Sequence, residues 1–110
     1  MGHALFVDVR ESYEYEAGHV AESLHMPIGQ ISEGWEKLPT GAPVVVVCQI
    51  GQRSSLVAQF LRERALDAHN LEGGLEAWVA AGLDLVSNIT DGKVVDGYAR
   101  DLKGRLIGGA

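Results

Sequence analysis

Short apolar runs alternate with helix-like segments along most of the chain. Four runs have the length and aliphatic content of strands: residues 4–9, 23–26, 44–48 and 68–71. Four segments between or after them have a helical pattern: residues 11–17, 28–37, 54–65 and 75–81. Strands that alternate with helices predict an α/β fold, in which helices flank a small parallel sheet on both faces.

Two of these elements have the strongest signals. Val44–Cys48 is continuous and rich in β-branched residues, as expected for a central strand that is covered on both faces. The segment 54–65 is the clearest helix, and its apolar positions recur at helical spacing: Leu56, Val57, Phe60 and Leu61. We therefore expect 44–48 and 54–65 to form the centre of the fold.

The end of the chain does not continue this alternation of strands and helices. We interpret residues 1–85 as one domain and residues 86–110 as an atypical C-terminal extension. Asp91-Gly92 favours a hairpin turn, and Lys93–Val95 has the composition of a strand. We expect the extension to add an edge strand or a hairpin, within a monomer or exchanged between the chains of a homodimer.

Composition excludes several classes of function. The 110 residues are 46% hydrophobic and 22% charged, which is ordinary for one soluble domain. A net charge of −6 without a basic cluster argues against nucleic acid as a partner. No apolar stretch approaches the roughly 18 residues of a membrane span. The N-terminus lacks the pattern of a signal peptide, so we expect a cytoplasmic protein.

The single cysteine, Cys48, is the most reactive residue type in the chain. It cannot form an intramolecular disulfide, and the four histidines do not have metal-ligand spacing around it, so we expect no metal. Cys48 ends the predicted central strand and precedes the clearest helix. This places it at the carboxyl edge of a parallel sheet, where α/β folds bind ligands.

The segment Cys48-Gln49-Ile50-Gly51-Gln52-Arg53-Ser54, the Cys48 loop below, has features of an anion site. Its N–H groups can converge on the sulfur, and the next helix begins with unpaired N–H groups. Gly51 permits positive φ, and Arg53 adds a positive charge. Both should favour a thiolate. The same residues also fit a buried core cysteine followed by a helix that Ser54 caps.

Four segments together resemble the rhodanese family. They are Asp8-Val9-Arg10-Glu11, Gly18-His19-Val20 followed by Pro27, the Cys48 loop, and Gly73-Gly74-Leu75-Glu76-Ala77-Trp78. They occur in family order and with family spacing over residues 4–83. The resemblance implies a rhodanese-like fold and a sulfurtransferase without a cofactor.

The resemblance also implies a reaction cycle. Thiosulfate or a persulfide donor would give sulfane sulfur to Cys48, and the Cys48 persulfide would pass it to a thiol, to cyanide or to a protein acceptor. Asp8 and Arg10 are expected to hold the loops around the site through hydrogen bonds and an ion pair. His19 is expected to form structural hydrogen bonds.

Loop length and composition separate the alternatives. Six residues from Cys48 through Arg53 suit sulfur transfer in this family, whereas phosphatase and arsenate-reductase relatives have one residue more. Those activities are further disfavoured by the absence of a second cysteine. A sulfur-carrier or redox-regulatory module that binds another protein is the other alternative. Gln49 stands where many members have arginine, which puts thiosulfate affinity in doubt.

Overall fold

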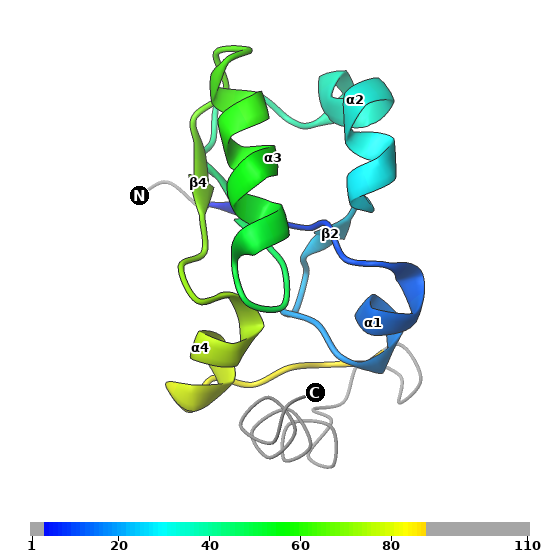
Figure 1. The fold of residues 1–110 in the computed structure, drawn as a ribbon, viewed down its shortest axis with the longest axis vertical. Helices are drawn as coiled ribbons and strands as arrows, with labels where there is room; N and C mark the ends of the chain where they lie inside the picture. The colour runs from blue at the N-terminus through cyan, green and yellow to red at the C-terminus, as the bar shows by residue number, and fades with distance from the viewer. Residues whose placement is uncertain (1–3, 88–110) are drawn as a thin grey trace.

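A four-stranded parallel sheet forms the centre of the molecule (Figure 1). The computed structural model describes residues 4–87. The strands are β1 (Leu5–Asp8), β2 (Leu24–His25), β3 (Val44–Val47) and β4 (Ala68–Asn70). Their order is β2-β1-β3-β4, and every neighbouring pair is parallel. The predicted parallel α/β fold is confirmed. The strand expected at Lys93–Val95 lies outside the described residues.

The helices follow the predicted pattern with shifted ends. They are α1 (Ser12–Ala17), α2 (Ile31–Gly34), α3 (Gln52–Arg62) and α4 (Gly74–Ala80). The single helix predicted for residues 28–37 is instead three short pieces, because 3₁₀ turns at Ile28–Gln30 (η1) and Trp35–Lys37 (η2) flank α2. Gly29 and Gly34 lie within this stretch, and glycine weakens a continuous α-helix.

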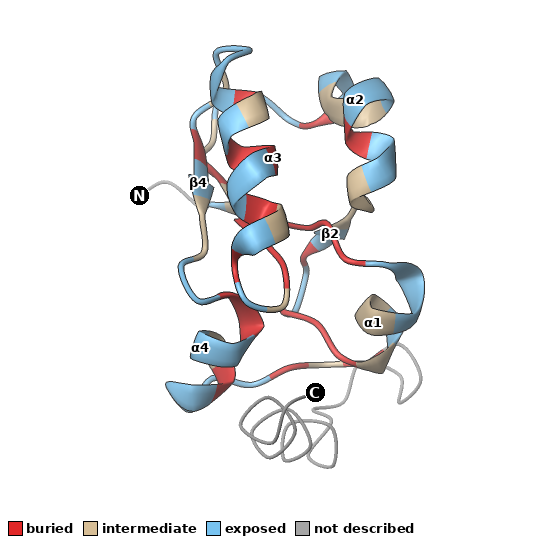
Figure 2. Ribbon diagram, in the orientation of Figure 1, coloured by how far each residue is buried: buried red, intermediate tan, exposed pale blue. Residues whose placement is uncertain are grey.

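Apolar side chains cover both faces of the sheet. On one face, the strands pack against α2 and α3 through the buried residues Val7, Val9, Ile31, Leu38, Val44, Val46, Val57, Ala58, Leu61 and Ala68. On the other face, Val47 packs with Leu75 and Val79 of α4. Figure 2 shows buried residues on α3 and α4. Successive residues of β3 therefore serve opposite faces, as the pleat of a strand requires.

Both ends of the helix predicted for residues 54–65, and one of its apolar positions, are wrong. The helix begins at Gln52, because Gly51 takes a left-handed conformation (φ 100°) and turns the chain immediately. It ends at Arg62, and Ala65 is left-handed with φ 69°. Leu56, which was placed with the apolar positions, is 66% exposed. Ser54 is accordingly in the first turn of α3 and is not its N-cap.

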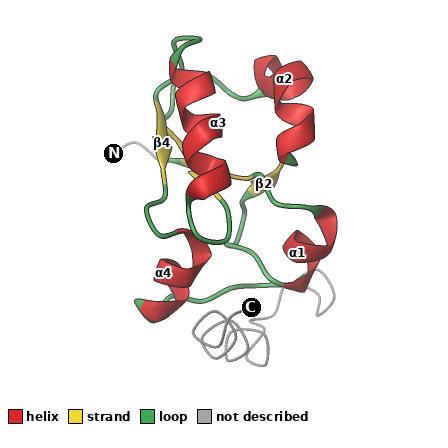
Figure 3. Ribbon diagram, in the orientation of Figure 1, coloured by secondary structure: helices red, strands yellow, loops and turns green. Residues whose placement is uncertain are grey.

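The carboxyl edge of the sheet brings three chain segments together. Asp8 ends β1 and is paired in register with Val47, the residue before Cys48. Asn70 ends β4 and is paired with Val46. Asp8, Cys48 and Asn70 therefore lie at the same edge of three neighbouring strands. The Cys48 loop leaves this edge and enters α3 (Figure 3).

Candidate active site

Hydrogen-bond donors converge on the sulfur of Cys48. The backbone N–H of Gly51 donates to Sγ at 3.1 Å, and that of Ser54 donates at 3.3 Å. The Ser54 hydroxyl lies 3.2 Å from the same atom. Cys48 itself is only 1% exposed. The two amides, and the hydroxyl when it donates, can stabilise a negative charge on the sulfur.

These donors change the acidity of the thiol. Burial raises the pKa of Cys48, but hydrogen bonds from the Ser54 hydroxyl and from the amides of Ser54, Gly51 and Ile50 outweigh it. The pKa of Cys48 is therefore lowered below its ordinary value. The thiolate is the nucleophilic form of cysteine, so the loop makes Cys48 more reactive near neutral pH.

Gly51 gives the loop its shape. Its φ of 100° is one that residues with a side chain rarely adopt. A Cβ atom at this position would also lie 3.2 Å from the amide nitrogen of Gly73. The loop can therefore close over the sulfur only with glycine here.

The start of α4 holds the other side of the loop. The N–H groups of Leu75 and Glu76 donate to the carbonyl oxygens of Cys48 and Gln49 at 2.9 and 3.1 Å. In a trans peptide the N–H points opposite to the C=O, so these bonds turn the next two loop amides away from α4. A Cβ atom on Gly74 would lie 2.5 Å from both carbonyl oxygens. The Gly73-Gly74 pair thus permits this close contact.

Asp8 and Arg10 form a buried ion pair beside the loop. Arg10 Nη2 lies 2.9 Å from Asp8 Oδ2, and both side chains are fully buried. The same guanidinium donates to the carbonyl of Gly18 at 2.7 Å and to Oε1 of Gln49 at 3.4 Å. A buried charge needs such partners. The pair connects the end of β1, the turn at Gly18 and the Cys48 loop.

Arg53 is paired with a carboxylate from α1. Its two terminal nitrogens donate to Glu14 Oε1 and Oε2 at 3.0 and 3.1 Å. Burial raises the pKa of Glu14, but the Arg53 hydrogen bond, the Glu11 amide and the charges of Arg53 and Arg10 lower it overall. The positive charge next to Cys48 is therefore largely balanced. Glu14 and Arg53 are 39 positions apart, so no local sequence pattern predicts that they meet.

Asn70 is a further site residue that sequence reasoning missed. Its Oδ1 accepts a short 2.5 Å hydrogen bond from the Ser54 hydroxyl, and its Nδ2 donates to the carbonyl of Gly51 at 3.2 Å. It thus contacts both residues that donate to the sulfur, Ser54 through its hydroxyl and Gly51 through its carbonyl oxygen. The only sequence signal was its position, since it ends the strand beside the one that leads to Cys48.

The remaining predicted residues lie at the margin of the site. Ile50 is 47% exposed, and Gln52 is exposed at the start of α3. With Gly51 they line one side of a hollow of about 510 Å³ on the outer face of the loop. His19 is buried, and its Nδ1 lies 2.6 Å from the carbonyl of Tyr15. Its ring also stacks on that of Tyr15, with the ring centroids 3.7 Å apart.

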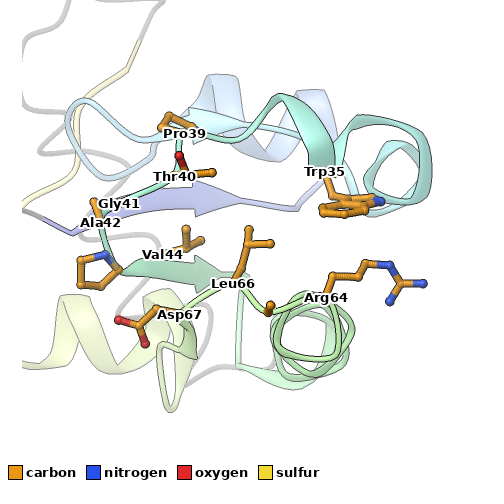
Figure 4. Close-up of a pocket in the computed structure, with 11 residues that line it drawn as sticks. Trp35, Pro39, Thr40, Gly41, Ala42, Val44, Arg64, Leu66 and Asp67 are labelled. Carbon is orange, nitrogen blue, oxygen red and sulfur yellow. The ribbon is translucent and has the colours of Figure 1, made fainter.

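A second pocket lies away from Cys48, at the amino edge of the sheet. It has a volume of about 400 Å³, and its lining includes Trp35, Val44 and Leu66 (Figure 4). Val44 begins β3, whereas Cys48 follows its end, so the strand separates this pocket from the sulfur. Trp35 both lines this pocket and packs against the core.

Among residues 4–87, no group of three or more His, Cys, Asp or Glu side chains is placed to hold a metal ion. None of the helices in the same range has the length and apolar character to cross a membrane.

The chain is similar to known proteins in sequence and in structure. Residues 1–81 match the family described as "Rhodanese-like domain". The chain is 38% identical over 77 residues to "Thiosulfate sulfurtransferase GlpE" of Coxiella burnetii, covering 69% of this chain and 72% of GlpE. It is 36% identical over 76 residues to the uncharacterized protein YqhL of Bacillus subtilis, covering 68% of this chain and 60% of YqhL.

A solved structure gives the same result for the fold. The crystal structure of a rhodanese-related protein from Thermoplasma volcanium matches with a TM-score of 0.73 and 32% identity, over 76% of this chain and 83% of that one. The family match over residues 1–81 agrees with the order of the sequence motifs and with the parallel sheet. The chain belongs to the rhodanese-like domain family.

Proposed function

We propose that this protein is a sulfurtransferase that carries sulfane sulfur as a persulfide on Cys48. The observation that supports this most directly is the set of donors around Sγ, from Gly51 and from Ser54. Such donors stabilise a thiolate before transfer and a negative charge on sulfur after it. The relatives named sulfurtransferase support the same chemistry.

The first half-reaction loads the cysteine. The Cys48 thiolate attacks the outer sulfur of the donor, and a bond forms between Sγ and that sulfur. The bond between the outer sulfur and the rest of the donor molecule breaks. The released part of the donor keeps the electron pair of that bond. Thiosulfate would release sulfite, and a thiol persulfide would release a thiolate. Covalent catalysis of this kind divides one difficult transfer into two easier steps.

The second half-reaction unloads it. Cyanide or a thiolate attacks the outer sulfur of the persulfide, and the bond between that sulfur and Sγ breaks. Its electron pair returns to Sγ and regenerates the thiolate, which the same donors stabilise. Because Cys48 is 1% exposed, the site favours reactants that present a single terminal sulfur. A tetrahedral phosphate ester would need a wider opening.

The charges around the loop favour a persulfide donor over thiosulfate. Gln49 brings no charge, and its Oε1 accepts a hydrogen bond from Arg10. Arg53 is balanced by Glu14 at 3.0 Å. Thiosulfate is a dianion and needs uncompensated positive charge, whereas a thiol persulfide has less negative charge to neutralise. We infer that a persulfide is the better donor for this chain.

Intact-mass spectrometry tests the proposal. The protein is incubated with thiosulfate or with a thiol persulfide, and then with cyanide. The expected result is a gain of one sulfur atom, which is then lost as thiocyanate. Cys48→Ala should gain no sulfur. Ser55→Ala, an exposed change in α3, is the matched control and should load as the parent does.

The outcomes separate the alternatives. A persulfide that forms but does not transfer to cyanide or to small thiols would indicate a sulfur-carrier module with a protein acceptor. The enzyme proposal fails if neither donor adds sulfur to Cys48.

A further inference from the structure

Asn70 and Cys48 both lie against one hydroxyl group, that of Ser54. The Ser54 oxygen is 2.5 Å from Asn70 Oδ1 and 3.2 Å from Cys48 Sγ. The amide of Asn70 has a defined orientation, because its Nδ2 donates to the Gly51 carbonyl at 3.2 Å and faces Glu72 Oε2 at 3.4 Å. A flipped amide would place oxygen against two oxygens. Oδ1 is therefore the atom that faces Ser54.

The hydroxyl has one proton and two possible acceptors. When Cys48 is a thiol, its S–H can donate to Ser54 Oγ while the Ser54 proton bonds Asn70. When Cys48 is a thiolate, the sulfur has no proton and is itself the acceptor. The Ser54 proton must then leave Asn70 in order to bond the sulfur. Thiolate formation thus costs the protein its Ser54–Asn70 hydrogen bond.

We propose that Asn70 is a positioning residue that holds the Ser54 proton away from Cys48 and so limits how readily the thiolate forms. The inference rests on the proposed role of Cys48 as a reactive thiolate. It concerns the protonation of the sulfur, which can be measured without a sulfur donor. A failure of the inference and a failure of the proposed function are therefore distinguishable.

Other charged groups near the loop are already engaged with one another. Arg53 on α3 is paired with Glu14 on α1, and Asp8 is paired with Arg10 at the end of β1. Glu72, in the turn after β4, faces Asn70 at 3.4 Å. None of these groups shares a proton with Ser54 in the hydrogen bonds described. The competition therefore involves Asn70, Ser54 and Cys48 alone.

The rate of Cys48 alkylation by iodoacetamide, measured from acid to alkaline pH, tests the inference. Asn70→Leu removes the competing acceptor and should speed alkylation about threefold to tenfold at a pH below the thiol pKa, which is the net worth of one hydrogen bond. Ser54→Ala removes the donor and should slow it. His69→Leu, an exposed change on the same strand, is the matched control and should leave the rate unchanged.

A double substitution separates this effect from a general loosening of the loop. Asn70 also bonds the Gly51 carbonyl, so Asn70→Leu alters more than one contact. If Asn70 acts through the Ser54 proton, Asn70→Leu should not speed alkylation when Ser54→Ala is also present. The proposal is overturned if Asn70→Leu changes the rate by the same factor with and without Ser54→Ala. Asn70→Asp keeps the acceptor and should not speed alkylation in either background.

Discussion

Replacing Glu14 by glutamine should increase the use of thiosulfate. Glu14 receives two hydrogen bonds from Arg53 and balances the positive charge of the Cys48 loop. Glutamine has nearly the same shape and keeps an oxygen to accept the Glu11 amide, which now lies 2.9 Å from Glu14 Oε1. The substitution therefore removes a charge and leaves the start of α1 intact.

The size of the effect follows from the position of the pair. The Arg53 side chain is 34% exposed and that of Glu14 is 18% exposed, so solvent screens their interaction. Partly exposed charge pairs of this kind interact by about 0.5–1 kcal/mol. Thiosulfate carries two negative charges, so Glu14 should oppose its binding at Arg53 by about 1–2 kcal/mol. At about 1.4 kcal/mol per tenfold, Glu14→Gln should raise kcat/KM for thiosulfate about fivefold to thirtyfold.

The assay is thiocyanate formation from thiosulfate and cyanide, with kcat/KM compared between variants. Glu16→Gln is the matched control, because it removes the same charge from an exposed position of the same helix. The gain should shrink as ionic strength rises, since salt screens charges near the surface. A thiol persulfide has less charge than thiosulfate, so kcat/KM for that donor should change less.

The pH dependence has a definite sign. The pKa of Glu14 is lowered overall, because hydrogen bonds and charge from Arg53 outweigh the effect of burial. The ion pair is therefore fully present above the ordinary glutamate pKa of about 4.3 and is lost as pH falls through the lower value in the folded protein. The ratio of kcat/KM for thiosulfate between Glu14→Gln and the parent should be constant near neutral pH. It should approach one in acid, where Glu14 of the parent is itself protonated. Equal effects of Glu14→Gln and Glu16→Gln, or a fall in kcat/KM, would refute the reasoning.

Three further predictions concern stability and are measured by urea denaturation. Gly74→Ala should lower the free energy of unfolding by about 2–4 kcal/mol more than Gly82→Ala, because both residues have positive φ but only Gly74 is crowded; equal losses would exclude the clash. Leu61→Ala should cost about 2–5 kcal/mol and Leu56→Ala less than about 0.5 kcal/mol, since Leu61 is fully buried and Leu56 is 66% exposed; similar losses would contradict this. Ala65→Gly should stabilise the protein by about 0.5–1 kcal/mol because φ is 69° there; a loss of stability would show that the left-handed conformation is not strained.

The fold was predictable because its strands and helices depend on local composition. Four consecutive valines favour a strand covered on both faces, and both faces of β3 are covered. The start of α3 was predicted wrongly because it depends on the backbone conformation of a single residue. Gly51 takes positive φ and starts α3 two residues before Ser54, which changes Ser54 from a predicted cap into a donor to sulfur. Serine is common at the N-cap of helices, but this preference does not predict that Ser54 would donate a hydrogen bond to Cys48.

The charge of the site was less predictable, because it depends on contacts between distant segments. Arg53 was expected to be a positive charge beside Cys48, but Glu14, 39 residues earlier, balances it. Asn70 bonds Ser54 from 16 residues later. A loop sequence specifies which groups are present, whereas packing decides which of them remain available to a substrate. In this chain the loop length and the amide donors favour sulfur chemistry, and we propose that Glu14 and Asn70 tune how strongly the site binds anions and how readily the thiolate forms. Substitutions outside the loop should therefore change the choice of donor as much as substitutions within it.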